Sequence, residues 1–395
     1  MSEASFSNQP TPRLTARLHA LPPSGTMAVG LKVRELRNRG HHIVNLSGGL
    51  AEPAPTCLQA PIAFTAQRNV GADPAGEPDL RAALAAKLFR DHGLAYDPST
   101  EIVVTTGAKQ AILPTLLAML ESGDEVLVLD PCWVSYAPVI RLAGGVPIPV
   151  SLRCDGAFRL DAAAIAQAVG PRTRAIIINS PHNPTGRVFT HEELSGVARV
   201  AVDKNLWVLS DESFDKFVFD GNRHVSVASL EGMQERTVVV QSFSKAFALP
   251  GARVGYLAAP AALCRAVVRF NEHVITCVSP LMQSVALSAL ATETEWTERL
   301  IGQYRIKRQV AETALARIPG IKFRPTEGTF YAFVDVSAYG ASSEAFADRM
   351  IEQAGVAFTP GIAFGKEAEG HVRINLVGPL SELSEGLRRM HGELA

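Results

Sequence analysis

Short runs of Val, Ile and Leu alternate with stretches of helical periodicity from about residue 101 onward, and this alternation most constrains the fold. Apolar runs of this length are typical of strands buried on both faces of a parallel sheet, and the stretches between them are typical of covering helices. The predicted strands cover residues 102–105, 125–129, 175–179, 206–210, 237–241 and 253–258, and predicted helices cover 108–120, 134–143 and 191–204. The pattern therefore predicts an α/β fold with a mostly parallel sheet.

A chain of 395 residues is long enough for two or three domains. We expect residues 1–49 to form an N-terminal arm and part of a small domain, and residues 50–290 to form a large domain that contains the sheet. Residues 291–395 are expected to form a connecting helix and a small C-terminal α/β domain. The helical stretch that joins the domains is predicted at 283–318, and strands of the smaller domain are predicted at 330–336 and 372–376.

The charge balance and the cysteine pattern exclude several classes of protein. The 38 basic and 39 acidic residues give a net charge of -1, which argues against a nucleic-acid or membrane-surface partner. No run of about 18 apolar residues predicts a membrane span. The five cysteines form no C-x-x-C pair, and the polar N-terminus has no signal-peptide core, so we expect a reduced, cytoplasmic protein without a zinc site.

The loops after the predicted strands carry the residues of chemical interest, because ligands of α/β sheets bind beyond the carboxyl ends of the strands. Lys245 lies in the loop Ser242-Phe243-Ser244-Lys245, after the predicted strand at 237–241, and Arg253 follows it. A desolvated lysine offers a neutral amine that can form an imine, and a guanidinium suits a phosphate. The alternative is an exposed loop lysine without a chemical role.

Three further loops carry candidate residues. Asp211 follows the strand at 206–210 and would pair either with a cationic ligand nitrogen or with a basic residue of the fold. Asn183 lies in a turn-rich stretch, where capping the turn is the alternative to binding a ligand. His182 beside it has no metal-ligating partner nearby in the sequence, so we expect no metal there. Gly107 opens a helix, and the N–H groups of such a helix start bind anions.

An imine-forming lysine, a carboxylate for a pyridine nitrogen and a phosphate-binding helix start are together the parts that pyridoxal 5'-phosphate (PLP) requires. The chain resembles the class I/II aminotransferases, which have the PLP-dependent fold type I. The matching stretches are Thr106-Gly107-Ala108-Lys109-Gln110, Asp130-Pro131-Cys132-Trp133-Val134-Ser135-Tyr136, 179–186, Ser210-Asp211-Glu212, 242–245, Arg253-Val254-Gly255-Tyr256, Gly328-Thr329-Phe330-Tyr331, Pro360-Gly361 and Val372-Arg373-Ile374. The resemblance runs from about residue 43 to the C-terminus and implies a large PLP-binding domain and a smaller α/β domain.

The resemblance also implies a role for each candidate residue. Lys245 would carry PLP and later move the proton at the substrate α-carbon, and Asp211 would pair with the pyridine nitrogen. Asn183 would donate to the phenolic oxygen of the cofactor. Trp133 would stack on its ring, with a core tryptophan as the alternative. The phosphate would be held by Ser242, Ser244, Arg253 and the backbone of Ala108 and Lys109.

The substrate side of the implied site has fewer candidates. Arg373 resembles the arginine that binds the substrate α-carboxylate, and a surface salt bridge is the alternative role for it. The loop at Gly49 would lie close to the substrate, as would Asn183. No second arginine can be assigned to a substrate side chain.

Two positions depart from the family pattern. The family usually has a tyrosine three residues after the aspartate that pairs with the pyridine nitrogen, and here that residue is Phe214. It also has a tyrosine that reaches the phosphate of the neighbouring subunit, and the alignment of residues 76–81 puts Gly71 in its place. These changes are compatible with drift in a working aminotransferase, or with a site reshaped for a larger substrate or another reaction.

The resemblance leaves three alternatives for the activity. The first is an enzyme that acts on an α-amino acid through an external aldimine and exchanges its amino group with a 2-oxo acid. The second is a PLP-dependent lyase, cyclase or β/γ-replacement enzyme of a biosynthetic pathway, including one that uses S-adenosylmethionine or another bulky co-substrate. The third is a sensor module of a DNA-binding regulator, which the absence of a basic patch disfavours. By resemblance we also expect a homodimer.

Overall fold

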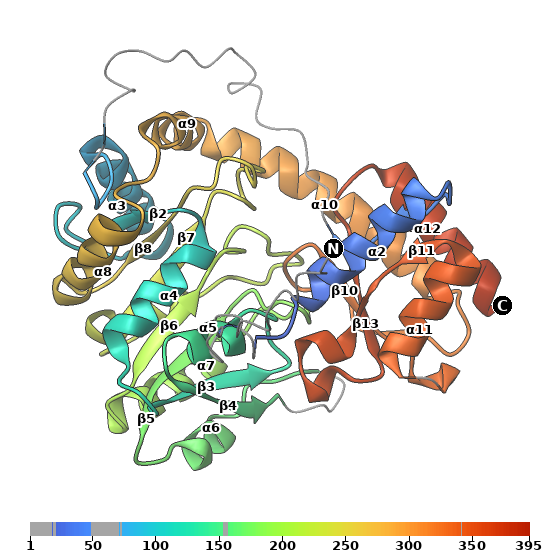
Figure 1. The fold of residues 1–395 in the computed structure, drawn as a ribbon, viewed down its shortest axis with the longest axis horizontal. Coiled ribbons are helices and arrows are strands. Elements are labelled where there is room, and N and C mark those ends of the chain that lie inside the picture. The colour runs from blue at the N-terminus through green and yellow to red at the C-terminus, as the bar shows by residue number, and fades with distance from the viewer. Residues whose placement is uncertain (1–17, 19–20, 49–70, 72, 153–156, 341) are drawn as a thin grey trace, which may run out of the picture.

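A computed structural model describes residues 18, 21–48, 71, 73–152, 157–340 and 342–395 of the chain. Its large sheet has seven strands in the order β2-β8-β7-β6-β5-β3-β4 (Figure 1). Their bounds are β2 Ile102–Thr105, β3 Glu125–Asp130, β4 Val146–Ser151, β5 Thr173–Asn179, β6 Trp207–Asp211, β7 Thr237–Ser242 and β8 Gly255–Ala258. Only β8 runs antiparallel to its neighbours, so the predicted α/β fold with a mostly parallel sheet is confirmed.

The large sheet is buried on both faces because its strands are apolar at successive positions. The helices around it are α3 Pro78–His92, α4 Ala108–Met119, α5 Tyr136–Leu142, α6 Ala162–Ala168, α7 His191–Asp203, α8 Ala261–Val274 and α9 Pro280–Leu290. Along β3, Val126 and Val128 pack in the cluster formed with α4, α5 and α8, whereas Leu127 and Leu129 pack in the cluster formed with α6 and α7. This alternation follows from the two-residue period of a strand.

A second, smaller sheet lies toward the C-terminal end of the chain (red in Figure 1). It is antiparallel, in the order β12-β13-β10-β9, and β1 pairs separately with β11. The strand bounds are β1 Val44–Asn45, β9 Lys322–Phe323, β10 Tyr331–Asp335, β11 Val356–Ala357, β12 Thr359–Pro360 and β13 His371–Asn375. The helices of this part are α2 Gly25–Asn38, α10 Glu293–Leu315, α11 Ser343–Arg349 and α12 Leu380–Leu394. Val44 and Leu46 pack in the same core as α10 and α12, so the N-terminal segment belongs with this part.

The segment predicted as one helix at 283–318 is two helices. Helix α9 ends at Leu290 and α10 begins at Glu293, with Thr292 in a non-helical conformation between them. Glu293 and Glu295 lie in the first turn of α10, where acidic side chains stabilise a helix N-terminus. The single-helix prediction was therefore wrong at this break. None of the described helices is long and apolar enough to span a membrane.

Candidate active site

The carboxyl ends of β2, β3, β5, β6 and β7 lead into loops that line one cavity of about 280 Å³. Residues far apart in the sequence meet here because parallel strands end at the same edge of a sheet. All the residues predicted to contact PLP line this cavity, namely Ala108, Lys109, Trp133, Asn183, Asp211, Ser242, Ser244, Lys245 and Arg253.

The acid of the cavity is Asp211, the last residue of β6, whose side chain is buried. Its carboxylate accepts hydrogen bonds from the Tyr136 hydroxyl at 2.8 Å and from the Ser213 N–H at 3.1 Å. Burial raises the pKa of Asp211, and these two donors partly offset that rise. No basic side chain of the described residues forms an ion pair with Asp211. The carboxylate is therefore placed to receive a cationic group from a ligand.

Lys245 lies in the loop after β7, where the Ser244 N–H donates to the Ser242 hydroxyl at 3.0 Å. Its Nζ lies 5.6 Å from the ring centroid of Phe214 and 5.2 Å from that of Phe330. Within the described residues no carboxylate lies close enough to form an ion pair with this amine. A lysine whose amine faces aromatic rings inside a cavity is placed to react with a carbonyl group.

A cationic cradle lies where Gly107 precedes α4. The backbone of Gly107 has φ +77°, and a Cβ there would lie only 2.7 Å from Nη2 of Arg253. Burial together with the nearby charges of Arg253 and Lys245 lowers the pKa of Lys109. The positive charge of Lys109, disfavoured by two neighbouring cations beside a helix N-terminus, favours a bound anion. Only a glycine at position 107 leaves the space for it.

Trp133 forms a side of the cavity close to Asp211. Its ring is half-buried and meets the Tyr136 ring edge-on, with centroids 5.3 Å apart. The ammonium group of Lys109 lies 4.9 Å from the centroid of the Trp133 ring. The indole therefore faces the cavity between the acid and the cationic cradle, where a planar ligand can stack on it.

Arg373 on β13 is 4% exposed, so the surface salt bridge considered for it is ruled out. Its Nη1 donates to Oδ1 of Asn183 at 2.8 Å, and its Nη2 donates to the Ser47 carbonyl at 3.3 Å. The guanidinium carbon lies 4.0 Å from the Tyr331 ring centroid, and its Nε has no hydrogen-bond partner among the described residues. Burial lowers the pKa of Arg373. A buried guanidinium without a carboxylate partner fits a carboxylate brought by a substrate.

Known proteins share this architecture. The profile of the aminotransferase class I and II family matches residues 48–390. The chain belongs to this family. It is 34% identical over 391 residues to the probable aspartate/prephenate aminotransferase of Aquifex aeolicus, which covers 95% of this chain and 97% of that protein.

Other members of the family give the same result. The chain is 40% identical to aromatic-amino-acid aminotransferase 2 of Thermococcus litoralis, over 79% of this chain and 80% of that protein. The solved structure of Thermus thermophilus aspartate aminotransferase with maleate superimposes with a TM-score of 0.91 at 35% identity, covering 97% of this chain and 100% of that one. The protein is therefore an aminotransferase-family enzyme of PLP-dependent fold type I, and these relatives favour transamination over the lyase, cyclase and replacement alternatives.

Aminotransferases of this family use PLP, and the residues of the cavity fit that group. The pyridine nitrogen would meet the buried Asp211 carboxylate, which has no ion-pair partner in the described part of the chain. The phosphate would meet the cradle that Gly107 keeps open beside Arg253. The aldehyde would meet the amine of Lys245. The three chemical features of the cofactor thus have three matching groups in one cavity.

The two departures from the family pattern lie in different surroundings. Phe214 is buried and meets the rings of Phe330 and Phe217 edge-on, with centroids 5.1 and 6.1 Å apart. The aromatic ring is thus kept as a packing group while the hydroxyl is lost. Gly71 is exposed, and a Cβ there would have no heavy atom of the described residues within 4 Å. The candidate Gly49 lies outside the described residues.

Two residues of the site were missed as functional residues. Tyr136 and Tyr331 lie in stretches that match the family, but no role was predicted for either side chain. Tyr136 donates to Asp211, and Tyr331 packs its ring against the guanidinium of Arg373. The signal available was the local match alone, because the partners lie 75 and 42 positions away in the sequence.

His182 lies next to the site but takes no part in it. It is buried, its Nδ1 lies 2.7 Å from the Thr185 hydroxyl, and burial lowers its pKa to about 3. In the described part of the chain, the groups of His and acidic side chains close enough to share a metal ion are His92 with Glu212 and His224, and Asp91 with His92 and Asp215. His182 belongs to neither group.

Proposed function

We propose that this chain binds PLP in the cavity at the carboxyl ends of the large sheet and transfers the amino group of an α-amino acid to a 2-oxo acid. The observation that carries the proposal is the meeting of the buried Asp211 carboxylate, the Lys245 amine and the cationic cradle at Gly107 in one cavity. No one of these features specifies PLP alone, whereas the three together match its nitrogen, aldehyde and phosphate.

The cofactor contacts follow from this placement. Asp211 would hold the pyridine nitrogen in its protonated form, with Tyr136 and Ser213 keeping the carboxylate ionised. The phosphate would be bound by Ser242, Ser244, Arg253 and the backbone of Ala108 and Lys109, and Trp133 would cover the ring. PLP supplies a conjugated ring that accepts the electron pair left when the substrate loses its α-proton.

The remaining residues would bind and orient the substrate. Arg373 would bind the α-carboxylate, and the hydrogen bond from its Nη1 to Oδ1 of Asn183 orients the Asn183 amide so that its NH₂ group is free to donate to the phenolic oxygen of the cofactor. Lys245 would take the α-proton and return it at the cofactor carbon, because among the described residues its amine lines the cavity, faces two aromatic rings and forms no ion pair with an acid. Aromatic rings around this amine exclude water from it.

We propose an acidic amino acid such as aspartate as the amino donor. Support comes from relatives named aspartate aminotransferase in Pyrococcus abyssi, at 40% identity, and Geobacillus stearothermophilus, at 32% identity. Relatives named for aromatic amino acids and for prephenate support these compounds as alternative substrates. A homodimer in the cytoplasm, as expected for the family, completes the proposal, and light scattering on the purified protein tests the dimer.

The decisive experiment follows the nitrogen atom. The purified holoenzyme is mixed with ¹⁵N-aspartate and 2-oxoglutarate, and the products are analysed by mass spectrometry. We expect ¹⁵N-glutamate and oxaloacetate in equal amounts, and none from a Lys245→Ala variant. Retention of ¹⁵N in a product derived from the donor, with no 2-oxo acid formed across a panel of acidic and aromatic donors, would contradict transamination.

A further inference from the structure

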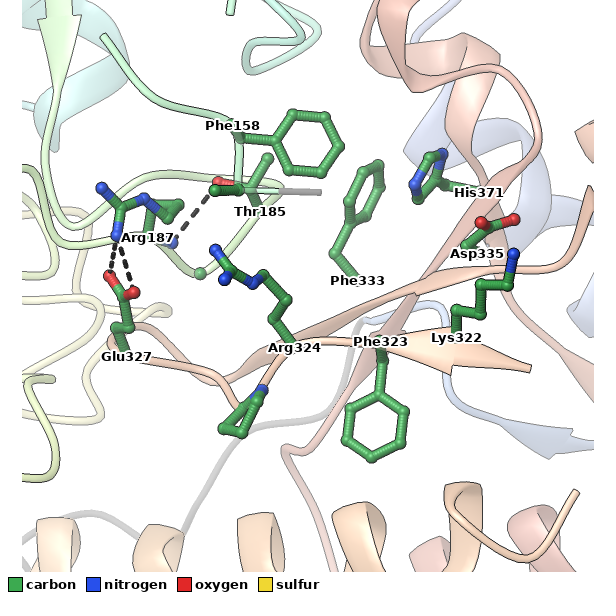
Figure 2. A pocket seen from close by; sticks show the side chains of 13 residues that line it. Phe158, Thr185, Arg187, Lys322, Phe323, Arg324, Glu327, Phe333, Asp335 and His371 are labelled. Atoms are coloured by element: carbon green, nitrogen blue, oxygen red, sulfur yellow. Dashed lines mark hydrogen bonds and ion pairs between the residues drawn. The ribbon is translucent and has the colours of Figure 1, made fainter. Parts of the chain in front are cut away.

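A second cavity, of about 380 Å³, is lined in part by residues that closely follow Asn183 in the chain (Figure 2). It is bounded by residues 185–187 and by β9, β10 and β13 of the small sheet. It shares no described lining residue with the catalytic cavity. Its volume falls within the range of about 300–1,000 Å³ found for small-molecule sites.

One wall of this second cavity is aromatic. The rings of Phe333 and His371 are stacked with centroids 4.8 Å apart and an interplanar angle of 6°. Phe158 meets both rings edge-on at 5.5 Å. The backbone of Phe158 has φ +46°, which a bulky residue rarely adopts, so its ring is held at this wall at a conformational cost. Such a wall favours a planar ring over an aliphatic group.

The basic residues that line this cavity differ in whether an acidic residue already pairs with them. Both terminal nitrogens of Arg187 are paired with acids, because Nη1 donates to Glu327 at 2.6 and 2.7 Å and Nη2 donates to Glu193 at 3.1 Å. Lys322 is the cross-strand partner of Asp335, and its charge, after that of His371, favours the ionised form of this acid, although no ion pair joins the two side chains among the described residues. Arg324 is exposed on the rim, and no described acidic residue forms an ion pair with it. Figure 2 shows its guanidinium directed toward the loop of Thr185 and Arg187.

We propose that this cavity is an accessory site for a small aromatic carboxylate, whose ring packs against Phe333, His371 and Phe158 and whose carboxylate pairs with Arg324. The combination of a flat apolar wall and one unpaired guanidinium specifies that chemical class. The site is separate from the catalytic cavity but lies next to Arg373, the residue proposed to bind the substrate α-carboxylate, because Phe333 is the cross-strand partner of Arg373.

The test uses naphthalene-2-carboxylate as the probe, with isothermal titration calorimetry on the holoenzyme. We expect a site outside the catalytic cavity, one per chain, that binds the carboxylate more tightly than naphthalene-2-carboxamide, its neutral analogue. Loss of one exposed charge-assisted contact in Arg324→Ala should weaken binding at least about fivefold. Arg317→Ala is the matched control, because Arg317 is an exposed arginine of the same part of the chain that does not line the cavity.

A carboxylate probe also has an affinity for the catalytic clamp, so the titration is repeated with an Arg373→Ala variant. Binding that persists in Arg373→Ala and is weakened in Arg324→Ala supports the accessory site. Binding that disappears in Arg373→Ala, that is unchanged in Arg324→Ala, or that falls equally in Arg317→Ala overturns it. Arg324 is exposed, so its substitution leaves the fold and the basal transaminase activity intact and the result interpretable.

Discussion

The hydroxyl of Tyr136 donates to Asp211 across a distance of 2.8 Å, which ties the first turn of α5 to the end of β6. Burial already raises the pKa of Asp211, and Tyr136 is one of the donors that counter it. The strength of the contact between Asp211 and the cofactor nitrogen therefore depends on a residue outside the expected PLP contacts. In physical terms, Tyr136 keeps a buried carboxylate charged.

Removing this donor in Tyr136→Phe should raise the pKa of Asp211 further and weaken PLP binding. A buried hydrogen bond to a charged group is worth about 1.5–3 kcal/mol, so we expect the PLP dissociation constant to rise roughly 10- to 100-fold. The measurement is a fluorescence titration of the apoenzyme with PLP. Tyr96→Phe is the control, because the buried Tyr96 hydroxyl has no hydrogen-bond partner in the part of the chain that the structure describes. Equal affinities in the wild type and Tyr136→Phe would contradict the assignment.

Substitution of Arg373 is expected to impair substrate binding far more than cofactor retention. In Arg373→Gln the α-carboxylate loses its charge-assisted donors, and we expect the KM for aspartate to rise roughly 10- to 100-fold. Steady-state kinetics give KM, and cofactor absorbance gives PLP occupancy, which should stay complete. Arg373→Lys keeps the positive charge but loses the bidentate hydrogen bonding of a guanidinium, so its KM for aspartate should lie between those of the wild type and Arg373→Gln. A variant that loses PLP but keeps its KM would assign Arg373 to the cofactor instead.

Phe214 predicts a change in how the bound cofactor titrates. A tyrosine hydroxyl at this position would stabilise the phenolate form of the cofactor by about 1 kcal/mol, which corresponds to roughly one pH unit. Phe214→Tyr should therefore lower the midpoint of the pH-dependent change in cofactor absorbance by about one unit. The edge-on contacts with Phe330 and Phe217 keep the ring in place in the variant. A midpoint that stays the same or rises would show that the missing hydroxyl has no electronic role.

Gly107 predicts a defect specific to the cofactor phosphate. An alanine there would be strained at φ +77° and would place its Cβ 2.7 Å from Nη2 of Arg253. Gly107→Ala should weaken PLP binding at least about tenfold, while affinity for pyridoxal without the phosphate stays unchanged. Gly302→Ala in α10 is the control, because a Cβ at Gly302 meets no heavy atom within 4 Å. Equal losses for PLP and pyridoxal would place the phosphate elsewhere.

A buried ionic network that includes Lys87 and Asp91 of α3 predicts that the stability of the fold decreases in acid. Burial opposes ionisation of Asp91, but Lys87 at 3.0 Å and Lys216 at 2.7 Å hold its pKa at about 2. The folded-state pKa lies below the ordinary value of about 3.9, so this stabilisation is present above pH ~4 and is lost as the pH falls toward ~2.

Asp91→Asn should therefore lower the free energy of unfolding at neutral pH by roughly 1–2 kcal/mol. The free energy of unfolding of this variant should also fall less steeply than that of the wild type as the pH is lowered. Urea unfolding at a series of pH values measures this. Glu272→Gln, at an exposed position of α8, should leave the curve unchanged. A variant curve parallel to that of the wild type down to the lowest pH would contradict the role given to Asp91.

The fold was predictable where burial is complete. The strand expected at 102–105 is found at those residues, because all four are apolar or buried and the chain turns at Gly107. Strand β4 was not predicted, since Pro147 and Pro149 argue against a strand. It forms because β4 lies at the edge of the sheet and pairs only with β3, where a missing N–H costs little.

The site was predictable to the extent that chemistry is local in sequence. Lys245 and Asp211 follow predicted apolar strands, which made them candidates, and the combination of the loops and the family resemblance gave them a role. The donor to Asp211 could not, because nothing near Tyr136 in the sequence indicates that α5 packs its hydroxyl against the end of β6. The burial of Arg373 depends likewise on Tyr331 and Phe364, which tertiary packing brings to it.

The hydrogen bond from Arg373 to Asn183 joins a residue of the small sheet to a loop of the large one. Through it, the group expected to bind the substrate carboxylate orients the amide expected to face the cofactor. A change of substrate that dispensed with the α-carboxylate would thus disturb the cofactor environment as well. Binding of the substrate carboxylate and orientation of the Asn183 amide thus depend on the same hydrogen bond. We therefore expect substrate specificity to change in evolution through the residues that contact the substrate side chain, while the α-carboxylate remains required.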